Sequence, residues 1–148
     1  MIQEQLMKNM TSVQSLVICN SEGFEYYSKI LEGNTITYEP ILLSGFISAI
    51  GALGRQLFKA DLATIHFDNN AANGNSPYNI VIVTKDFYQN EKRIHFVFLV
   101  NGIVDIKEIR KFCTEAYINA KEFFFREEKV RKKDLDDKID KVVGAFFM

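Results

Sequence analysis

Residues 15–31 read SLVICNSEGFEYYSKIL, and residues 42–58 read LLSGFISAIGALGRQLF. The first stretch holds two apolar runs around the polar turn Asn20-Ser21-Glu22-Gly23, which predicts a hairpin of strands at 13–19 and 24–31. The second predicts a helix over 40–59, because Pro40 is tolerated in a first helical turn. A hairpin that leads directly into a helix occurs in few small-domain architectures.

The remaining chain predicts three more strands, at 62–68, 78–84 and 93–100. Asp105 and Glu108 are spaced as a capping box, which predicts the start of a long amphipathic helix. Asp134 could cap a last helix, although one continuous helix stays open. The predicted fold is α/β (α+β), with a central five-stranded, mainly antiparallel sheet in the order β-β-α-β-β-β-α-α. Apolar residues on both sides of 93–100 predict helices on both faces of the sheet.

The helix over 40–59 has two contrasting sides. One side is an apolar stripe, which we expect to be buried, at Leu42, Phe46, Ala49, Ile50, Leu53 and Leu57. The opposite side carries small or polar residues, which we expect to be exposed, at Ser44, Ser48, Gly51 and Arg55. Gly45, Gly51 and Gly54 each cost roughly 1 kcal/mol relative to alanine in a helix. We therefore expect this helix to approach a sheet or a partner helix closely.

Length and composition bound the class of protein. The 148 residues suit one domain, and we predict an N-terminal arm or short helix over 1–12 and a single domain over 13–148. The net charge of −1 argues against a general nucleic-acid binder. Cys19 and Cys113 are typical of buried free thiols, and the N-terminus does not resemble a secretory signal. No apolar run is long enough for an integral membrane segment. These features predict a cytoplasmic protein.

Motifs for catalysis or cofactor binding are missing from the sequence. His66 and His95 have no neighbouring residues at metal-ligand spacing, so we interpret them as structural or surface histidines and expect no metal. There is no GxSxG motif, and residues 51–56, GALGRQ, lack the ending of a phosphate-binding loop. We expect no cofactor and no enzymatic activity.

The hairpin LVICNSEGFEYYSK and the helix ILLSGFISAIGALGRQLF resemble those of longin and roadblock domains in the profilin-like fold group. The resemblance covers residues 13–125. The last helix suits a longin better, whereas a leading segment before the first strand is more typical of a roadblock domain. The resemblance implies a non-catalytic scaffold that dimerises with itself or with a related longin or roadblock protein. It also implies a partner among small Ras-like GTPases or vesicle-trafficking complexes, and it leaves open a peripheral membrane association through a partner.

The candidate interface residues follow from that resemblance and from the pattern of the helix. They are Ser44, Ser48, Gly51 and Arg55 on the small-residue side, together with Phe146 and Phe147 at the apolar C-terminus. The two phenylalanines are equally compatible with a place in the core. Two alternatives to the scaffold remain: a small-molecule sensor with a pocket between sheet and helices, and a profilin-like actin binder. The actin binder is the weaker alternative, because the N-terminal segment has no tryptophan.

Overall fold

The structure is a computed structural model, and it describes residues 13–21, 24–31, 40–67, 78–87, 92–102, 104–125 and 132–147. The described chain divides into two compact units. One unit contains the five strands and helix α2, and the other contains helices α3 and α4. The predicted arm over 1–12 lies outside the described residues, and the assignment of 13–148 to a single domain stays a prediction.

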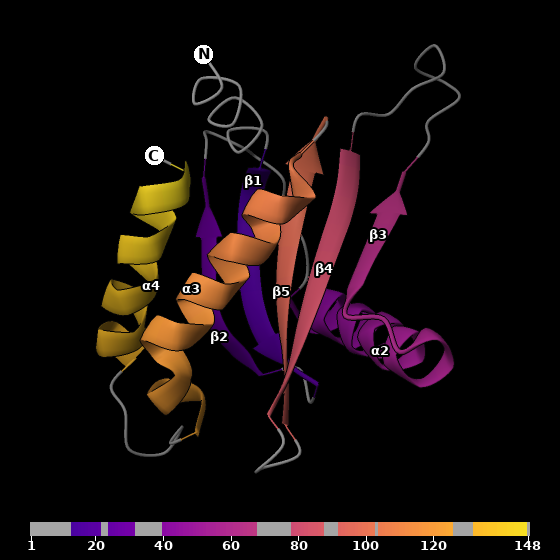
Figure 1. The fold of residues 1–148 in the computed structure, drawn as a ribbon, viewed down its shortest axis with the longest axis horizontal. Coiled ribbons are helices and arrows are strands. Elements are labelled where there is room, and N and C mark those ends of the chain that lie inside the picture. Colours follow the sequence, from indigo (N-terminus) through magenta and orange to yellow (C-terminus); the bar gives the residue numbers. More distant parts are fainter. Residues whose placement is uncertain are drawn as a thin grey trace. The chain divides into compact units, whose positions relative to one another are not determined.

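The first unit is built on one five-stranded sheet (Figure 1). Its strands are β1 (Val13–Asn20), β2 (Glu25–Ile30), β3 (Leu62–His66), β4 (Tyr78–Phe87) and β5 (Lys92–Asn101). They lie in the order β2-β1-β5-β4-β3, and every neighbouring pair is antiparallel. The sheet and the order of elements confirm the predicted fold class. β2 and β3 form its two edges.

The turn of the first hairpin is held by one residue. The Asn20 backbone N–H donates to the Phe24 carbonyl at 2.9 Å, and the Asn20 side-chain oxygen accepts from the Phe24 backbone N–H at 2.9 Å. Asparagine is favoured in turns because its short side chain can satisfy nearby backbone groups. The sequence signal at Asn20 therefore has a direct physical cause.

Two strands run further than the sequence predicts. β4 continues to Phe87 and β5 begins at Lys92, so the ladder between them reaches the pair Phe87 and Lys92. Near this end Asp86 and Arg93 are cross-strand partners, and the Arg93 Nε lies 3.3 Å from the Asp86 Oδ1. Opposite charges on facing positions favour strand pairing. This pairing explains why charged residues expected in a loop continue the sheet.

Helix α2 (Pro40–Phe58) covers one face of the sheet. Ile47 is completely buried there. Its cluster draws on three strands, through Val17, Cys19, Ile82 and Val97. Side chains on both faces of β5 are buried, in agreement with the apolar residues on both sides of this segment.

The second unit consists of α3 (Ile106–Phe125) and α4 (Lys132–Phe147), so the C-terminal segment forms two helices. The Asp105 Oδ1 accepts from the Lys107 backbone N–H at 2.9 Å, which confirms the predicted cap of α3. α4 begins at Lys132, two residues before the predicted cap at Asp134. The Lys132 ammonium forms an ion pair at 2.6 Å with Asp136, one helical turn further on. This pair lies within the first turns of α4.

Candidate interaction surface

The orientation of α2 on the sheet differs from the predicted one. Ile47, which was outside the predicted apolar stripe, is the buried residue, and Ile50 is partly buried beside it. Three members of the predicted stripe are exposed instead: Phe46 by 43%, Leu53 by 50% and Leu57 by 63%. These three follow one another at helical spacing and share one side of α2. The prediction that the whole stripe is buried was wrong.

The position of the helix explains this exposure. Figure 1 shows α2 reaching past β3, which is the last strand of the sheet on that side. Side chains near the C-terminal end of the helix therefore have no strand beneath them, and Phe58 is 75% exposed. The predicted stripe is apolar because of its composition, but the sheet is too narrow to cover it all.

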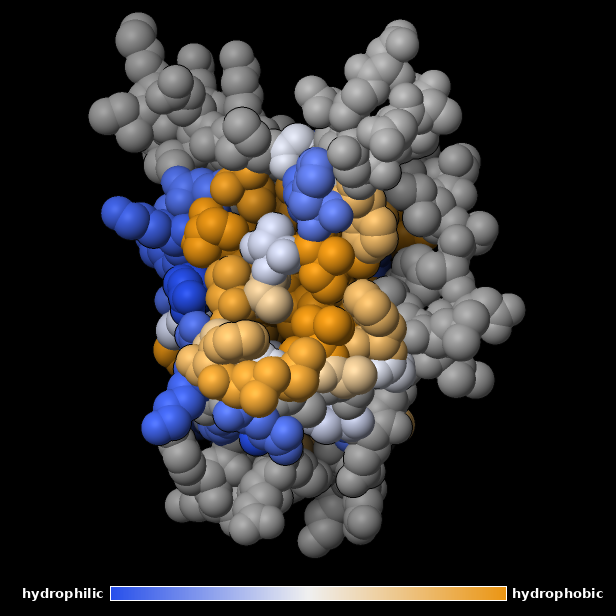
Figure 2. All heavy atoms as spheres, turned by 90° about the vertical axis from the view of Figure 1, so that its right-hand side faces the viewer, coloured by the Kyte–Doolittle hydropathy of each residue, from blue (hydrophilic) through white to orange (hydrophobic). Residues whose placement is uncertain are grey.

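The exposed apolar residues form one surface, which we call the α2–β3 surface. Its members are Phe46, Leu53, Leu57 and Phe58 from α2 and Phe67 directly after β3. Figure 2 shows this side of the molecule, with apolar residues at its centre and hydrophilic residues along part of its border. A contiguous apolar area on a protein surface is typical of an interaction site.

The residues predicted for an interface fall into two groups. Ser44, Ser48, Gly51 and Arg55 belong to α2, but their side chains lie outside the described part of the structure. Phe146 and Phe147 are half-buried, and both rings contact Phe112, with centroid distances of 5.6 and 5.0 Å. Their assignment to an interface stays a prediction.

Two of the three helix glycines have no close neighbour in this chain. A Cβ atom added at Gly45 or Gly54 would meet no heavy atom within 4 Å, apart from adjacent helix backbone. The expected close approach of α2 to the sheet is therefore not found at these two positions. The surroundings of Gly51 lie outside the described residues.

The outer edge of β3 presents backbone groups next to the α2–β3 surface. The Thr84 backbone N–H donates to the Asp61 carbonyl at 2.8 Å, which fixes the phase of the ladder between β3 and β4. In an antiparallel pair, alternate residues point their N–H and C=O groups toward the neighbouring strand and away from it. Leu62, Thr64 and His66 therefore direct these groups away from β4, toward a side where no described strand lies.

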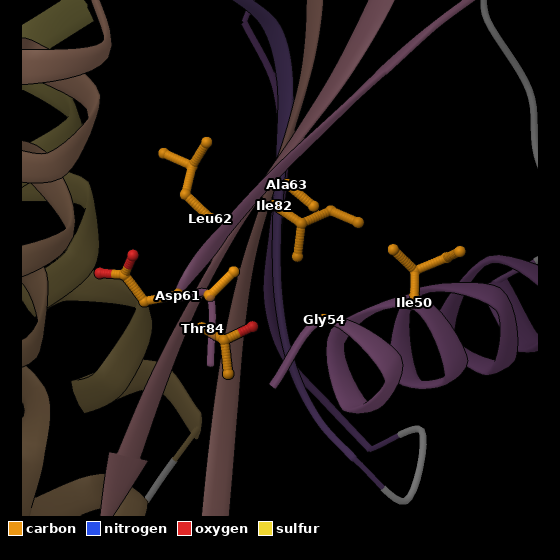
Figure 3. A pocket seen from close by; sticks show the side chains of 8 residues that line it. Ile50, Gly54, Asp61, Leu62, Ala63, Ile82 and Thr84 are labelled. Carbon is orange, nitrogen blue, oxygen red and sulfur yellow. The ribbon is translucent and has the colours of Figure 1, made fainter. Parts of the chain in front are cut away.

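A small hollow lies beneath the C-terminal half of α2 (Figure 3). Its cavity volume is about 10 Å³, which is the space that one water molecule needs. Ile50, Gly54 and Ile82 line it, with Thr84 at the polar end. Among the described residues, this hollow offers no room for an organic ligand.

A buried histidine lies on the same face of the sheet. The His95 Nδ1 is 2.9 Å from the Thr84 Oγ1, and its Nε2 is 3.1 Å from the Ser21 Oγ. Burial, with a smaller contribution from the positive charge of Arg93, lowers the pKa of His95 from 6.5 to about 4. Burial also raises the pKa of the neighbouring Cys19 thiol to about 12, reinforced by the negative charge of Glu25. A histidine that stays neutral and a thiol that stays protonated suit a structural role.

The second histidine has a different environment. His66 is exposed, and its Nδ1 lies 2.8 Å from the side-chain oxygen of Asn79. Because that oxygen can only accept, His66 donates through Nδ1. The Asn79 side-chain nitrogen donates to the Gly102 carbonyl at 3.3 Å, so the contact links the ends of β3, β4 and β5. Both histidines are thus hydrogen-bonded structural residues, as the sequence predicted.

Two further searches concern the described residues alone. Within them, no three His, Cys, Asp or Glu side chains lie close enough together to hold a metal ion. None of the described helices α2, α3 and α4 has the length and apolar character of a membrane span.

Comparisons with known proteins give relatives by structure but not by sequence. No family model and no curated protein matches the chain. The gliding protein MglB of Thermus thermophilus aligns over 96% of this chain and 85% of its own, with 7% identity and a TM-score of 0.52. MglB of Myxococcus xanthus aligns over 96% and 84%, with 12% identity and a TM-score of 0.46. A Roadblock/LC7 domain from Streptomyces avermitilis aligns over 95% and 91%, with 8% identity and a TM-score of 0.38. The chain therefore has the longin-like roadblock fold, to which MglB and the Roadblock/LC7 domain also belong.

Proposed function

We propose that this protein is a non-catalytic interaction scaffold that forms dimers and binds a small Ras-like GTPase or a vesicle-trafficking complex. The observation that carries the proposal is the exposed apolar α2–β3 surface. Leaving Leu57 and Phe58 in water forfeits roughly 25 cal/mol for each Å² of apolar area that could be buried. A partner that covers this surface recovers that free energy.

The GTPase part of the proposal rests on the resemblance of residues 13–125 to longin and roadblock domains, which act as platforms for small GTPases. The shared fold supports it, although a fold alone hosts many functions. The apolar surface adds a property specific to this chain, namely an area suited to protein contact rather than to chemistry.

The non-catalytic part rests on the character of the groups that could perform chemistry. His95 is the one buried histidine of the described chain, and at a pKa of about 4 it is a weak base at neutral pH. Cys19, with its pKa near 12, is a thiol and not a nucleophilic thiolate. The sensor and actin-binding alternatives stay predictions from the sequence, because no described feature favours either.

Light scattering after size exclusion, over a micromolar concentration range, tests self-association. Pull-down with Ras-like GTPases loaded with GDP or with a GTP analogue tests partner binding. We expect a dimer that retains at least one GTPase in one nucleotide state. A protein that stays monomeric and retains none of them would contradict the proposal, and a thermal-shift screen with small molecules would then test the sensor alternative.

A further inference from the structure

We propose that the α2–β3 surface is covered by a second copy of this chain, whose β3 pairs with β3 antiparallel across a two-fold axis at Thr64. The sheet would then continue from one copy into the other. This inference rests on the proposed self-association, and it adds which surface is used and in which register.

The first argument is the character of the β3 edge. Exposed edge strands in natural proteins are normally blocked by lysine, proline or a bulge, because free backbone groups invite another strand. β3 has the sequence LATIH, which contains neither residue, and its register against β4 is regular over all five positions. The edge is therefore open to pairing.

The second argument is the helix that reaches past this edge. A strand added beside β3 would lie about 4.8 Å further out. That position is under the C-terminal end of α2, where Leu53, Leu57 and Phe58 have no strand beneath them (Figure 1). Strand addition would thus satisfy the backbone groups of the edge and cover the apolar side chains together.

The third argument identifies the added strand as β3 of a second copy. A two-fold contact uses the same patch on both partners, so the patch must be complementary to itself. A regular strand edge and an apolar surface meet this requirement, whereas a surface of one charge sign would repel its copy. The net charge of −1 adds little repulsion between two copies.

The ladder also fixes the register. Leu62, Thr64 and His66 point their backbone groups outward, and Thr64 is the middle one. A two-fold axis at Thr64 pairs it with its own copy and pairs Leu62 with His66 of the other copy. All three outward-pointing residues then form hydrogen-bonded pairs, which is the largest number that this strand can provide.

A cysteine cross-link tests the register in the full-length protein. Cα atoms in a hydrogen-bonded antiparallel pair are about 5.5 Å apart, within the range of a disulfide. We expect Thr64→Cys to form a disulfide-linked dimer under mild oxidation, while the buried Cys19 and Cys113 stay reduced. Ile30→Cys is the control, because Ile30 is equally accessible but lies on β2 at the opposite edge. Cross-linking of Ile30→Cys but not of Thr64→Cys would overturn the proposal.

Two substitutions separate edge pairing from helix contact. Thr64→Pro removes an N–H that points away from β4, so the fold should survive while dimer affinity falls at least about tenfold. Thr64→Val keeps the N–H and should leave the affinity unchanged. On the helix, Leu57→Lys should weaken the dimer, whereas Gln56→Lys, one residue earlier, places the same charge outside the apolar side.

The outcomes also distinguish this inference from the proposed function. A dimer whose affinity is unaffected by Thr64→Pro and Leu57→Lys, with circular dichroism showing both variants folded, refutes this interface and leaves the scaffold intact. A wild-type protein that remains monomeric but retains a GTPase refutes the interface and the dimer, and leaves only the GTPase contact. Loss of self-association in Thr64→Pro and Leu57→Lys alone supports the inference.

Discussion

The His95 imidazole and the Thr84 hydroxyl face each other across β5 and β4, with the Nδ1 and Oγ1 atoms 2.9 Å apart. The His95 side chain is fully buried, and its other nitrogen contacts the Ser21 hydroxyl. A hydroxyl can donate or accept, so the neutral ring is satisfied in either tautomer. The ring therefore replaces an apolar residue in this face of the sheet without leaving an unpaired polar atom.

This arrangement makes the protein sensitive to acid. The unfolded chain binds a proton at His95 near pH 6.5, whereas the folded chain binds it only near pH 4. Stability from this group is therefore complete above pH 6.5 and is lost as the pH falls to 4. The loss amounts to roughly 3 kcal/mol of unfolding free energy. Urea unfolding at a series of pH values between 7 and 4 measures it.

His95→Gln provides the control for this prediction. Glutamine does not titrate, so the variant should be less stable at pH 7 but should lose less stability on acidification than the wild type. The informative quantity is the difference between the two slopes, because the carboxylates titrate in both proteins. Equal slopes would show that His95 does not couple folding to pH.

The order of elements could be predicted because its signals are local. Asn20 marks the hairpin turn through its own hydrogen bonds, and Asp105 marks the start of α3 through the contact with Lys107. The ends of β4 and β5 could not be predicted, because the ion pair of Asp86 with Arg93 depends on two strands lying side by side. Local chemistry is visible in a sequence, and cross-strand partners are not.

The interaction surface was only partly predictable for a similar reason. The sequence singled out α2 as the element with an unusual composition, and α2 indeed carries most of the exposed apolar side chains. It could not orient the helix, because Phe46 and Ile47 are both apolar and only contact with the sheet decides which one is buried. The deciding fact is that α2 reaches past β3, and this depends on the width of the sheet.

Lys59 offers a test of backbone strain directly after α2. Its φ of 53° lies in the left-handed region, which costs a non-glycine residue roughly 1 kcal/mol. We expect Lys59→Gly to raise the free energy of unfolding by about 0.5 to 1 kcal/mol, measured by urea denaturation. Lys59→Ala keeps the Cβ and should change stability little. A similar gain in both variants would mean that the lysine side chain, not its φ, limits stability.

Gly54 offers a test of the hollow beneath α2. Space for a methyl group exists at this position, and alanine is favoured over glycine in a helix by about 1 kcal/mol. We expect Gly54→Ala to raise the thermal midpoint of unfolding. Gly102→Ala is the contrasting variant, because Gly102 has a φ of 94° and should be destabilised by a side chain despite the open space around it. A loss of stability in Gly54→Ala would show that the helix lies closer to the sheet than described.

The contacts of Phe112 with Phe146 and Phe147 decide what the C-terminal phenylalanines do. Phe112 is fully buried, so Phe112→Ala should lower the free energy of unfolding by about 3 to 5 kcal/mol. Phe147→Ala removes a half-buried ring and should have a smaller effect, larger than that of Ile118→Ala on the exposed side of α3. If Phe147 stabilises α4 against α3, this variant loses stability while its mass by light scattering stays that of the wild type at the same concentration. A variant that keeps its stability and loses self-association would instead assign Phe147 to an interface, because only a contact between copies depends on concentration.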